Sequence, residues 1–165
     1  MKTSTLIKNA TIINEGKNFV ADVLVEDGII SKIGNLPPTS SYKFIDGTGK
    51  HLFPGIIDAQ VHFRDPGLTH KGDISTESKA AVAGGVTSFI DMPNTVPNVL
   101  TTEILNEKYR IASEKSLANF GFFLGANESN IDDVIKKDTS QFIGVSDDRL
   151  YFSGKGNLLA DRAGG

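Results

Sequence analysis

Short runs of hydrophobic residues, broken by turn residues, fill the first fifty positions of the chain. The runs are TLIKNATII, FVADVLVEDGIISKIG and YKFIDG, and Glu-Gly, Asp-Gly and Pro-Pro pairs lie between or within them. Runs of this length bounded by turn residues are typical of β-strands, and Asp27-Gly28 inside the second run predicts a hairpin. Residues 1–52 are therefore expected to form a small all-β unit.

From residue 53 onward, hydrophobic strands alternate with segments of helical pattern. FPGIID predicts a buried strand, and VTSFIDM, NFGFFLGA and QFIGV predict the strands that follow it. The segments between them predict helices: GDISTESKAAVAGG, TTEILNEKYRIASEKS and SNIDDVIKKD. Alternation of this kind is typical of an α/β fold with a parallel sheet, so residues 53–165 are expected to hold about four βα units.

Two of the predicted helices show which side should face the core. The alanines of the first, Ala80, Ala81 and Ala83, are expected to pack, and Gly84-Gly85 to end the helix. In the second helix a spacing near 3.6 residues marks one stripe. Its members are Ile104, Leu105, Lys108, Ile111 and Ala112.

Composition narrows the classes of function. Hydrophobic residues make up 39% and charged residues 22% of the 165 positions. No apolar run reaches the length of about 18 residues needed to span a bilayer, and no signal segment is evident, so a cytoplasmic location is expected. The net charge of −3, with both signs interspersed, offers no cationic surface for nucleic acid or membrane. A small-molecule partner is therefore expected.

The polar residues that follow the first two predicted barrel strands are the candidates for chemistry, because functional groups in a parallel barrel lie at the C-terminal ends of strands. They are Asp58, Gln60, His62, Arg64 and Asp65 after the first strand, and Asp91 and Asn94 after the second. Residues two apart on an extended segment point the same way, so Gln60, His62 and Arg64 are expected on one side.

These side chains suit metal-assisted hydrolysis combined with anion recognition. Imidazole binds zinc at neutral pH, and guanidinium binds a carboxylate through two hydrogen bonds. The chain has no cysteine, so a metal would be held by histidine, carboxylate or modified lysine. Spacing alone leaves other readings open: His62 as a hydrogen-bonded histidine, Arg64 in a loop salt bridge, and Asn94 as a turn residue.

The sequence motifs in two segments indicate a family more specifically than the spacing of the polar residues does. FPGIIDAQVHFRDPGLTHKGDI, followed by AVAGGVTSFIDMPNTVP, resembles the dihydroorotase family of the cyclic amidohydrolases. Members of that family open with P-G-x-I-D-x-H-x-H-x-R-x-P-G and continue with G-G-x-T and M-P-N-T. The resemblance extends to about Val145 and implies a metal-dependent (β/α)8 barrel. It also implies a small β-sandwich built from both chain ends, of which residues 1–52 would be the N-terminal portion.

The resemblance implies roles for four residues. His62 corresponds to the second metal-binding histidine of the opening motif and Gln60 to the first, while Arg64 and Asn94 correspond to residues that hold the substrate carboxylate. The implied reaction interconverts dihydroorotate and N-carbamoyl-aspartate in pyrimidine biosynthesis, with one or two zinc ions. A metal-bound hydroxide would attack the ring amide, and an aspartate late in the barrel would carry the proton. No catalytic residue is assigned within this chain.

Three departures from the family pattern weaken the expected activity. The first is Gln60, which replaces a histidine; the second is Ser146, which stands where the family has a carboxylated lysine and for which Lys155 is a poor substitute; the third is the length of the chain. A closed barrel needs about 250 residues, and this chain ends at Gly165. The chain is therefore expected to form an incomplete barrel and to be inactive by itself.

Two alternatives remain. The first is a hydantoinase-like or allantoinase-like cyclic amidohydrolase, although Arg64 with Asn94 favours a substrate that carries a carboxylate. The second is a non-catalytic dihydroorotase-like partner of aspartate carbamoyltransferase, which Gln60 and Ser146 favour modestly. A homo-oligomer is compatible with each. Metal content discriminates between an enzyme and a scaffold.

Overall fold

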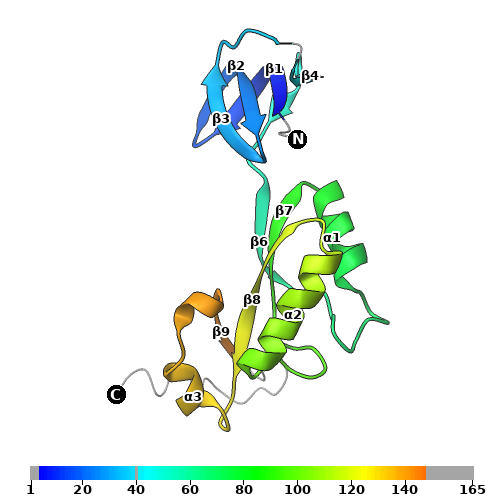
Figure 1. The fold of residues 1–165 in the computed structure, drawn as a ribbon, viewed down its shortest axis with the longest axis vertical. Coiled ribbons are helices and arrows are strands. Elements are labelled where there is room, and N and C mark those ends of the chain that lie inside the picture. The colour runs from blue at the N-terminus through cyan, green and yellow to red at the C-terminus, as the bar shows by residue number, and fades with distance from the viewer. Residues whose placement is uncertain (1–3, 40, 148–165) are drawn as a thin grey trace. The chain divides into compact units, whose positions relative to one another are not determined.

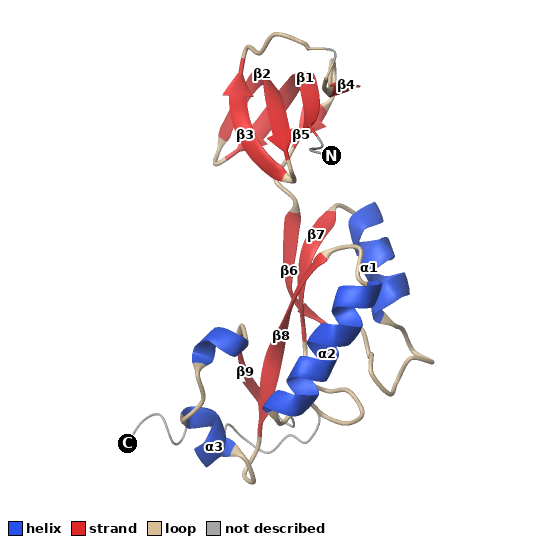
Figure 2. Cartoon of the chain, viewed as in Figure 1, coloured by secondary structure: helices blue, strands red, loops and turns tan. Residues whose placement is uncertain are grey.

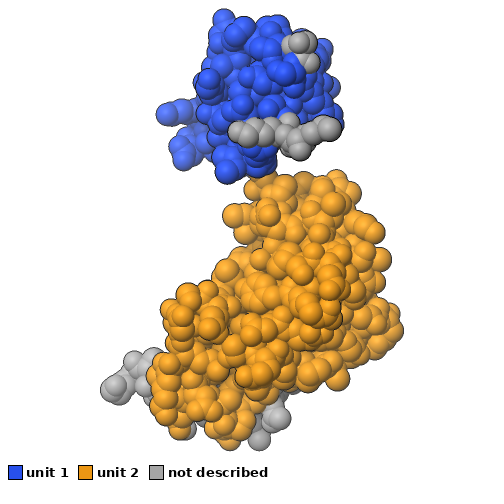
Figure 3. Space-filling model, viewed as in Figure 1, with its two compact units in different colours: residues 1–54 blue, residues 55–165 orange. Residues whose placement is uncertain are grey.

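The structure, a computed structural model, describes residues 4–39 and 41–147, and the chain divides into two compact units (Figures 1 and 3). Unit 1 is Met1–Pro54 and unit 2 is Gly55–Gly165. The tail that contains Lys155 lies outside the described residues. Within the described part of the chain, no helix is both long and apolar enough to cross a bilayer.

Unit 1 is a five-stranded sheet, as the hydrophobic runs predict (Figure 2). Its strands are β1 (Ser4–Asn14), β2 (Lys17–Glu26), β3 (Ile29–Gly34), β4 (Lys43–Asp46) and β5 (His51–Leu52). The order is β3-β2-β1-β4, with β5 also paired to β1. The first three strands are antiparallel, whereas β4 and β5 run parallel to β1. The buried hydrophobic residues of the sheet are Leu6, Ala10, Ile12, Val23 and Leu24.

The predicted hairpin at Asp27-Gly28 is confirmed. Glu26 pairs with Ile29 across the turn, and both central residues have positive φ, 51° for Asp27 and 82° for Gly28. A two-residue hairpin turn with positive φ at both positions has the hand that matches the strand twist. Asp-Gly therefore fixes the pairing of β2 with β3.

A buried carboxylate secures the irregular part of unit 1. Asp22 accepts hydrogen bonds from the backbone N–H groups of Leu36 at 2.8 Å and Asn9 at 2.9 Å, and from Lys8 Nζ at 2.7 Å. These bonds, that of Leu36 first, lower the pKa of Asp22 to about 2. Asn9 lies at a register shift in β1, so Asp22 fixes this bulge and the segment after β3.

Unit 2 is a parallel sheet flanked by helices, which confirms the predicted alternation. Its strands are β6 (Ile56–Val61), β7 (Val86–Asp91), β8 (Asn119–Ala126) and β9 (Gly144–Asp147), in the order β6-β7-β8-β9. The connections contain α1 (Ile74–Ala83), α2 (Thr102–Lys115), α3 (Ile131–Ile135) and the 3-10 turn η1 (Thr139–Gln141). Helices α1 and α2 lie side by side, and they contact β7 and β8 respectively (Figure 1).

The core of unit 2 lies between the helices and the sheet, and aromatic rings fill much of it. Phe63 and Phe89 have ring centroids 4.5 Å apart, and Tyr109 meets Phe122 edge-on at 4.8 Å. Edge-on and tilted pairs of this kind add to the free energy gained by burying their area. The packing joins the segment after β6 to β7, and α2 to β8.

Helix packing matches the prediction for α2 and only in part for α1. Leu105, Lys108 and Ala112 of the predicted stripe are buried. In α1 the buried residues are Ile74 and Ser78, and the half-buried Ala81 packs against the core, whereas Ala80 and Ala83 are exposed. The prediction was right for Ala81 and wrong for the other two alanines, because the packed face follows the helical spacing of Ile74, Ser78 and Ala81.

The outer strands also differ from expectation. The first barrel strand starts at Ile56 instead of Phe53, and it is exposed instead of buried, with Ile56 at 56% and Ile57 at 67% exposure. The reason is that β6 has a neighbour on one side only among the described residues. The fourth strand starts at Gly144, because Thr139–Gln141 forms the 3-10 turn.

We predict that Asp22→Asn lowers the free energy of unfolding of unit 1 by about 1–3 kcal/mol at neutral pH, because one side of the amide would face the donors Lys8 Nζ and Leu36 N–H. The native pKa of Asp22, about 2, lies below its unfolded value near 4, so its stabilisation is present above pH 4. As pH falls from about 4 to 2, the difference between variant and wild type should shrink. Denaturant unfolding followed on β1 and β2 amide signals measures it; a constant difference would contradict the assignment.

Candidate functional site

The C-terminal ends of β6 and β7 are aligned, and this brings the predicted site segments together. Val61 is the pairing partner of Asp91, and Met92 N–H donates to Val61 O at 3.0 Å. The residues that follow the two strands therefore start from neighbouring points at one edge of the sheet. This is the edge where parallel α/β folds carry their functional groups.

His62 and Asn94, predicted separately, are in direct contact. His62 Nδ1 lies 2.9 Å from Asn94 Oδ1. An amide oxygen accepts and cannot donate, so Nδ1 is the donor in this contact, and in the neutral ring the lone pair then lies on Nε2. A histidine with that tautomer is ready to bind a metal or accept a proton through Nε2. The amide nitrogen of Asn94 remains a donor for a ligand.

Arg64 lies two residues beyond His62, in a backbone conformation that the sequence did not predict. Its φ is 66°, and its carbonyl accepts from Leu68 N–H at 3.0 Å in a tight turn. The expected alternation of Gln60, His62 and Arg64 on one extended segment was therefore wrong, because the chain leaves extended geometry after the strand. Within residues 4–39 and 41–147 the half-buried Arg64 side chain makes no hydrogen bond or ion pair, so its guanidinium can bind an anion.

The described residues supply only part of the ligand set that the predicted metal position needs. Gln60 is exposed, and its backbone N–H donates to Asp58 Oδ1 at 3.1 Å, so Asp58 shapes the strand end. Ser146 lies on β9, where it pairs with Gly125 of β8, and its hydroxyl cannot replace a carboxylated lysine. In the described ranges no three His, Cys, Asp or Glu side chains gather as a metal site would need. One imidazole and one amide do not satisfy the four ligands of zinc, so these residues alone do not fit the ion.

The two loops that carry these residues are packed against each other. Gly67 has φ of 83°, and a Cβ atom there would overlap the carbonyl of Val96. Val96 N–H donates to Pro66 O at 3.2 Å. Only glycine allows this approach, since it has no side chain and tolerates positive φ. The loop after β6 and the loop after β7 therefore form one structural element.

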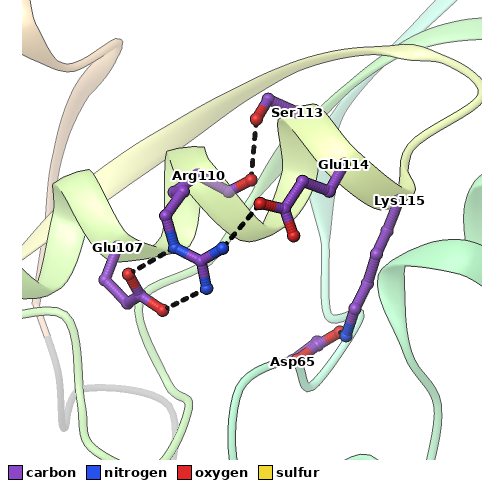
Figure 4. Close-up of polar contacts among 6 residues, drawn as sticks. All are labelled: Asp65, Glu107, Arg110, Ser113, Glu114 and Lys115. Carbon is purple, nitrogen blue, oxygen red and sulfur yellow. Dashed lines mark hydrogen bonds and ion pairs between the residues drawn. The ribbon is translucent and has the colours of Figure 1, made fainter.

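Asp65 ties the first loop to both helices. Its Oδ2 accepts from Lys115 Nζ at 2.9 Å near the end of α2 (Figure 4). It also accepts from Ile74 N–H at 3.5 Å at the start of α1. The carboxylate is buried, with 4% of the side chain exposed. By contrast, Arg110 pairs with Glu107 and Glu114 on the exposed surface of α2, where ion pairs contribute little stability.

A second buried carboxylate, Asp91, bonds to the backbone of the two segments that carry His62 and Asn94. Asp91 Oδ1 accepts from Phe63 N–H and from Met92 N–H, each at 3.0 Å, and Oδ2 lies 2.9 Å from Lys108 Nζ. Lys108 also donates to Met92 O at 2.9 Å. Burial lowers the pKa of Lys108, while the Asp91 charge opposes that shift.

Sequence reasoning missed this pair, although a signal was present. The sequence places Asp91 among the candidates after the second strand and Lys108 on the stripe of α2 that faces the core, but nothing in it joins the two. A lysine on a stripe that faces the core needs a buried partner, because an isolated buried ammonium is strongly unfavourable. The acid at the end of the preceding strand is the group that meets this need.

Comparisons with known proteins agree with this geometry. A sequence model described as "Amidohydrolase family" matches residues 51–155. An allantoinase of Deinococcus radiodurans is 36% identical over 135 residues, which is 81% of this chain and 30% of that protein. A dihydroorotase of Carboxydothermus hydrogenoformans is 50% identical over 94 residues, 56% of this chain and 22% of that protein. The chain thus spans less than a third of the length of these relatives.

Solved structures give the same result for the fold. The L-hydantoinase (dihydropyrimidinase) from Arthrobacter aurescens matches with a TM-score of 0.80 at 28% identity, covering 88% of this chain and 32% of that chain. The dihydropyrimidinase from Brevibacillus agri NCHU1002 matches with a TM-score of 0.68 at 28% identity, covering 80% and 30%. The predicted fold class, the N-terminal part of a metal-dependent-hydrolase (β/α)8 barrel after a small β unit, is confirmed.

We predict that Asn94→Ala shifts His62 from the Nδ1–H tautomer to the Nε2–H tautomer that a free imidazole favours, because the acceptor for Nδ1–H is lost. Two-bond proton–nitrogen NMR spectra of the neutral ring distinguish the two forms. Asn106→Ala, on the exposed part of α2, is the control and should leave the ring unchanged. An unaltered His62 spectrum in Asn94→Ala would show that Asn94 does not set the tautomer.

Proposed function

Because the chain belongs to the amidohydrolase family, we propose that it carries one side of a cyclic amide hydrolase site whose substrate is dihydroorotate. The reaction would open the ring to N-carbamoyl-aspartate or close it in reverse, in pyrimidine biosynthesis. Relatives named allantoinase, dihydroorotase and hydantoinase support the class of reaction. The observation that carries the proposal is that the Arg64 guanidinium has no partner within residues 4–39 and 41–147. Arg64 follows His62 by two positions in the sequence, and His62 contacts Asn94.

Dihydroorotate is favoured as the substrate over other cyclic amides because it carries a carboxylate. Arg64 would bind this carboxylate through two charge-assisted hydrogen bonds, and the amide nitrogen of Asn94 would donate to it as well. Hydantoin and allantoin carry no carboxylate, so a free arginine would be left without a partner in a site for either. Since Asn94 Oδ1 is occupied by His62, a bound substrate would be oriented relative to the imidazole.

Zinc is the proposed cofactor, because the family is generally metal-dependent. His62 would contribute its Nε2 atom, and Gln60 would contribute a weak amide oxygen. The described residues provide no further ligands, so those would have to come from residues outside the described ranges. A cytoplasmic location and the role of residues 1–52 as a β-sandwich portion belong to the same proposal.

The alternative is a non-catalytic dihydroorotase-like protein that binds aspartate carbamoyltransferase. Gln60 and Ser146 favour it, because both replace strong metal ligands of the family pattern with weak ones. A protein of this kind would need neither zinc nor dihydroorotate. Metal and ligand binding therefore separate the two proposals.

We predict that Arg64→Met weakens the binding of dihydroorotate to the purified chain about 10- to 100-fold, as expected for the loss of hydrogen bonds between charged groups. Isothermal titration calorimetry measures the Kd, and hydantoin should bind wild type and variant equally weakly. Arg110→Met, on the exposed surface of α2, is the matched control. Equal affinity of wild type and Arg64→Met for dihydroorotate would reject the clamp.

We also predict opposite effects of two substitutions on zinc binding. His62→Ala should lower zinc uptake by the chain, because it removes the imidazole of the predicted metal position, whereas Gln60→His should increase affinity by adding a second imidazole there. His70→Ala, in the following loop, is the control and should bind like wild type. Elemental analysis after dialysis gives the stoichiometry; identical zinc content in all four proteins would remove His62 from the site.

A further inference from the structure

The ion pair of Asp91 and Lys108 is almost entirely buried, and stability alone does not explain it. The side chains are 1% and 0% exposed. Taking two charges out of water costs about as much as their attraction returns, so a packed apolar pair of similar volume is often as stable or more so. A role other than stability is therefore worth seeking in what the two side chains contact.

We infer that Asp91 and Lys108 are positioning residues that hold His62 and Asn94 in contact. The inference rests on the proposed function, since it concerns two residues of that site. It assigns neither of them a contact with substrate or metal.

The carboxylate of Asp91 connects the two site loops. Asp91 Oδ1 is a shared acceptor for two N–H groups that belong to different loops, Phe63 and Met92. Phe63 is the residue directly after His62, and Met92 lies two residues before Asn94. One oxygen atom thus sets the separation of the backbone segments that carry the imidazole and the amide.

The lysine fixes the carboxylate. Lys108 Nζ lies 2.9 Å from Asp91 Oδ2 as an ion pair, and that oxygen accepts no hydrogen bond within residues 4–39 and 41–147. Nζ also donates to Met92 O, and it sits 4.8 Å from the centroid of the Phe122 ring. The ammonium belongs to α2 and contacts a ring of β8, so the ion pair links the carboxylate, and with it the two loop segments, to the helix and the sheet.

Two double variants separate positioning from charge. Asp91→Asn/Lys108→Met removes both charges but keeps an oxygen that can accept from Phe63 N–H and Met92 N–H. Asp91→Leu/Lys108→Met has nearly the same shape and no acceptor. Neither leaves an unpaired charge buried, so both are expected to fold. Asp22→Asn is the matched control, since it disrupts a buried carboxylate–lysine pair in unit 1.

The readouts are the tautomer of His62, from two-bond proton–nitrogen NMR, and the amide hydrogen exchange of Phe63, both in the full chain without metal or substrate. We expect the Asn variant and the Asp22→Asn control to retain the Nδ1–H tautomer. The Leu variant should lose it, with Phe63 exchange about tenfold faster or more. The same His62 spectrum in both double variants, whichever tautomer it shows, would overturn the inference.

A measurement on the wild-type chain covers the case in which a double variant does not fold. In low urea, the Nδ1–H signal of His62 should disappear together with the protection of the Phe63 amide, since one acceptor supports both. Persistence of that signal after Phe63 has become unprotected would overturn the inference as well. These readouts require no turnover and no zinc, so failure of the proposed function would appear separately, as absent binding of dihydroorotate or zinc.

Discussion

The buried contact between Asp91 and Lys108 is the constraint on which the arrangement of unit 2 depends. It joins the segment after β6 through Phe63 N–H, the end of β7 through Met92, α2 through Lys108 itself and β8 through the Phe122 ring. Either charge without the other would be strongly unfavourable in this core. The ion pair and its hydrogen bonds therefore connect these four elements at one point, and removing one charge alone is more harmful than removing both.

The chemistry of the site follows from that constraint. Once the two strand ends are fixed, His62 and Asn94 meet, and the meeting determines which imidazole nitrogen is free. The close approach of Gly67 to Val96 and the anchoring of Asp65 by Lys115 then hold the loop that carries Arg64. A rigid scaffold thus presents an imidazole, an amide and a guanidinium, and two of these suit a carboxylate.

Local sequence patterns predicted the parts of this fold that depend on local interactions. The βα alternation, the Asp27-Gly28 hairpin and the stripe of α2 all result from periodicity or turn chemistry, which neighbouring residues decide. The exposure of β6 was missed because it depends on which strands flank it, and the φ of Arg64 because it depends on a turn closed by Leu68. Their positions after predicted strands suggested His62 and Asn94 as candidates. The contact between them, and the pairing of Lys108 with Asp91, depend on the tertiary fold, so local sequence patterns could not predict them.

A crystal structure of the chain soaked with dihydroorotate would test the central claim most directly, namely that these loops form a carboxylate site beside an oriented imidazole. The account predicts the ligand carboxylate on the guanidinium of Arg64 and the amide nitrogen of Asn94, with His62 Nδ1 still bonded to Asn94 Oδ1. A ligand bound elsewhere, or bound here with the His62–Asn94 contact broken, would contradict it.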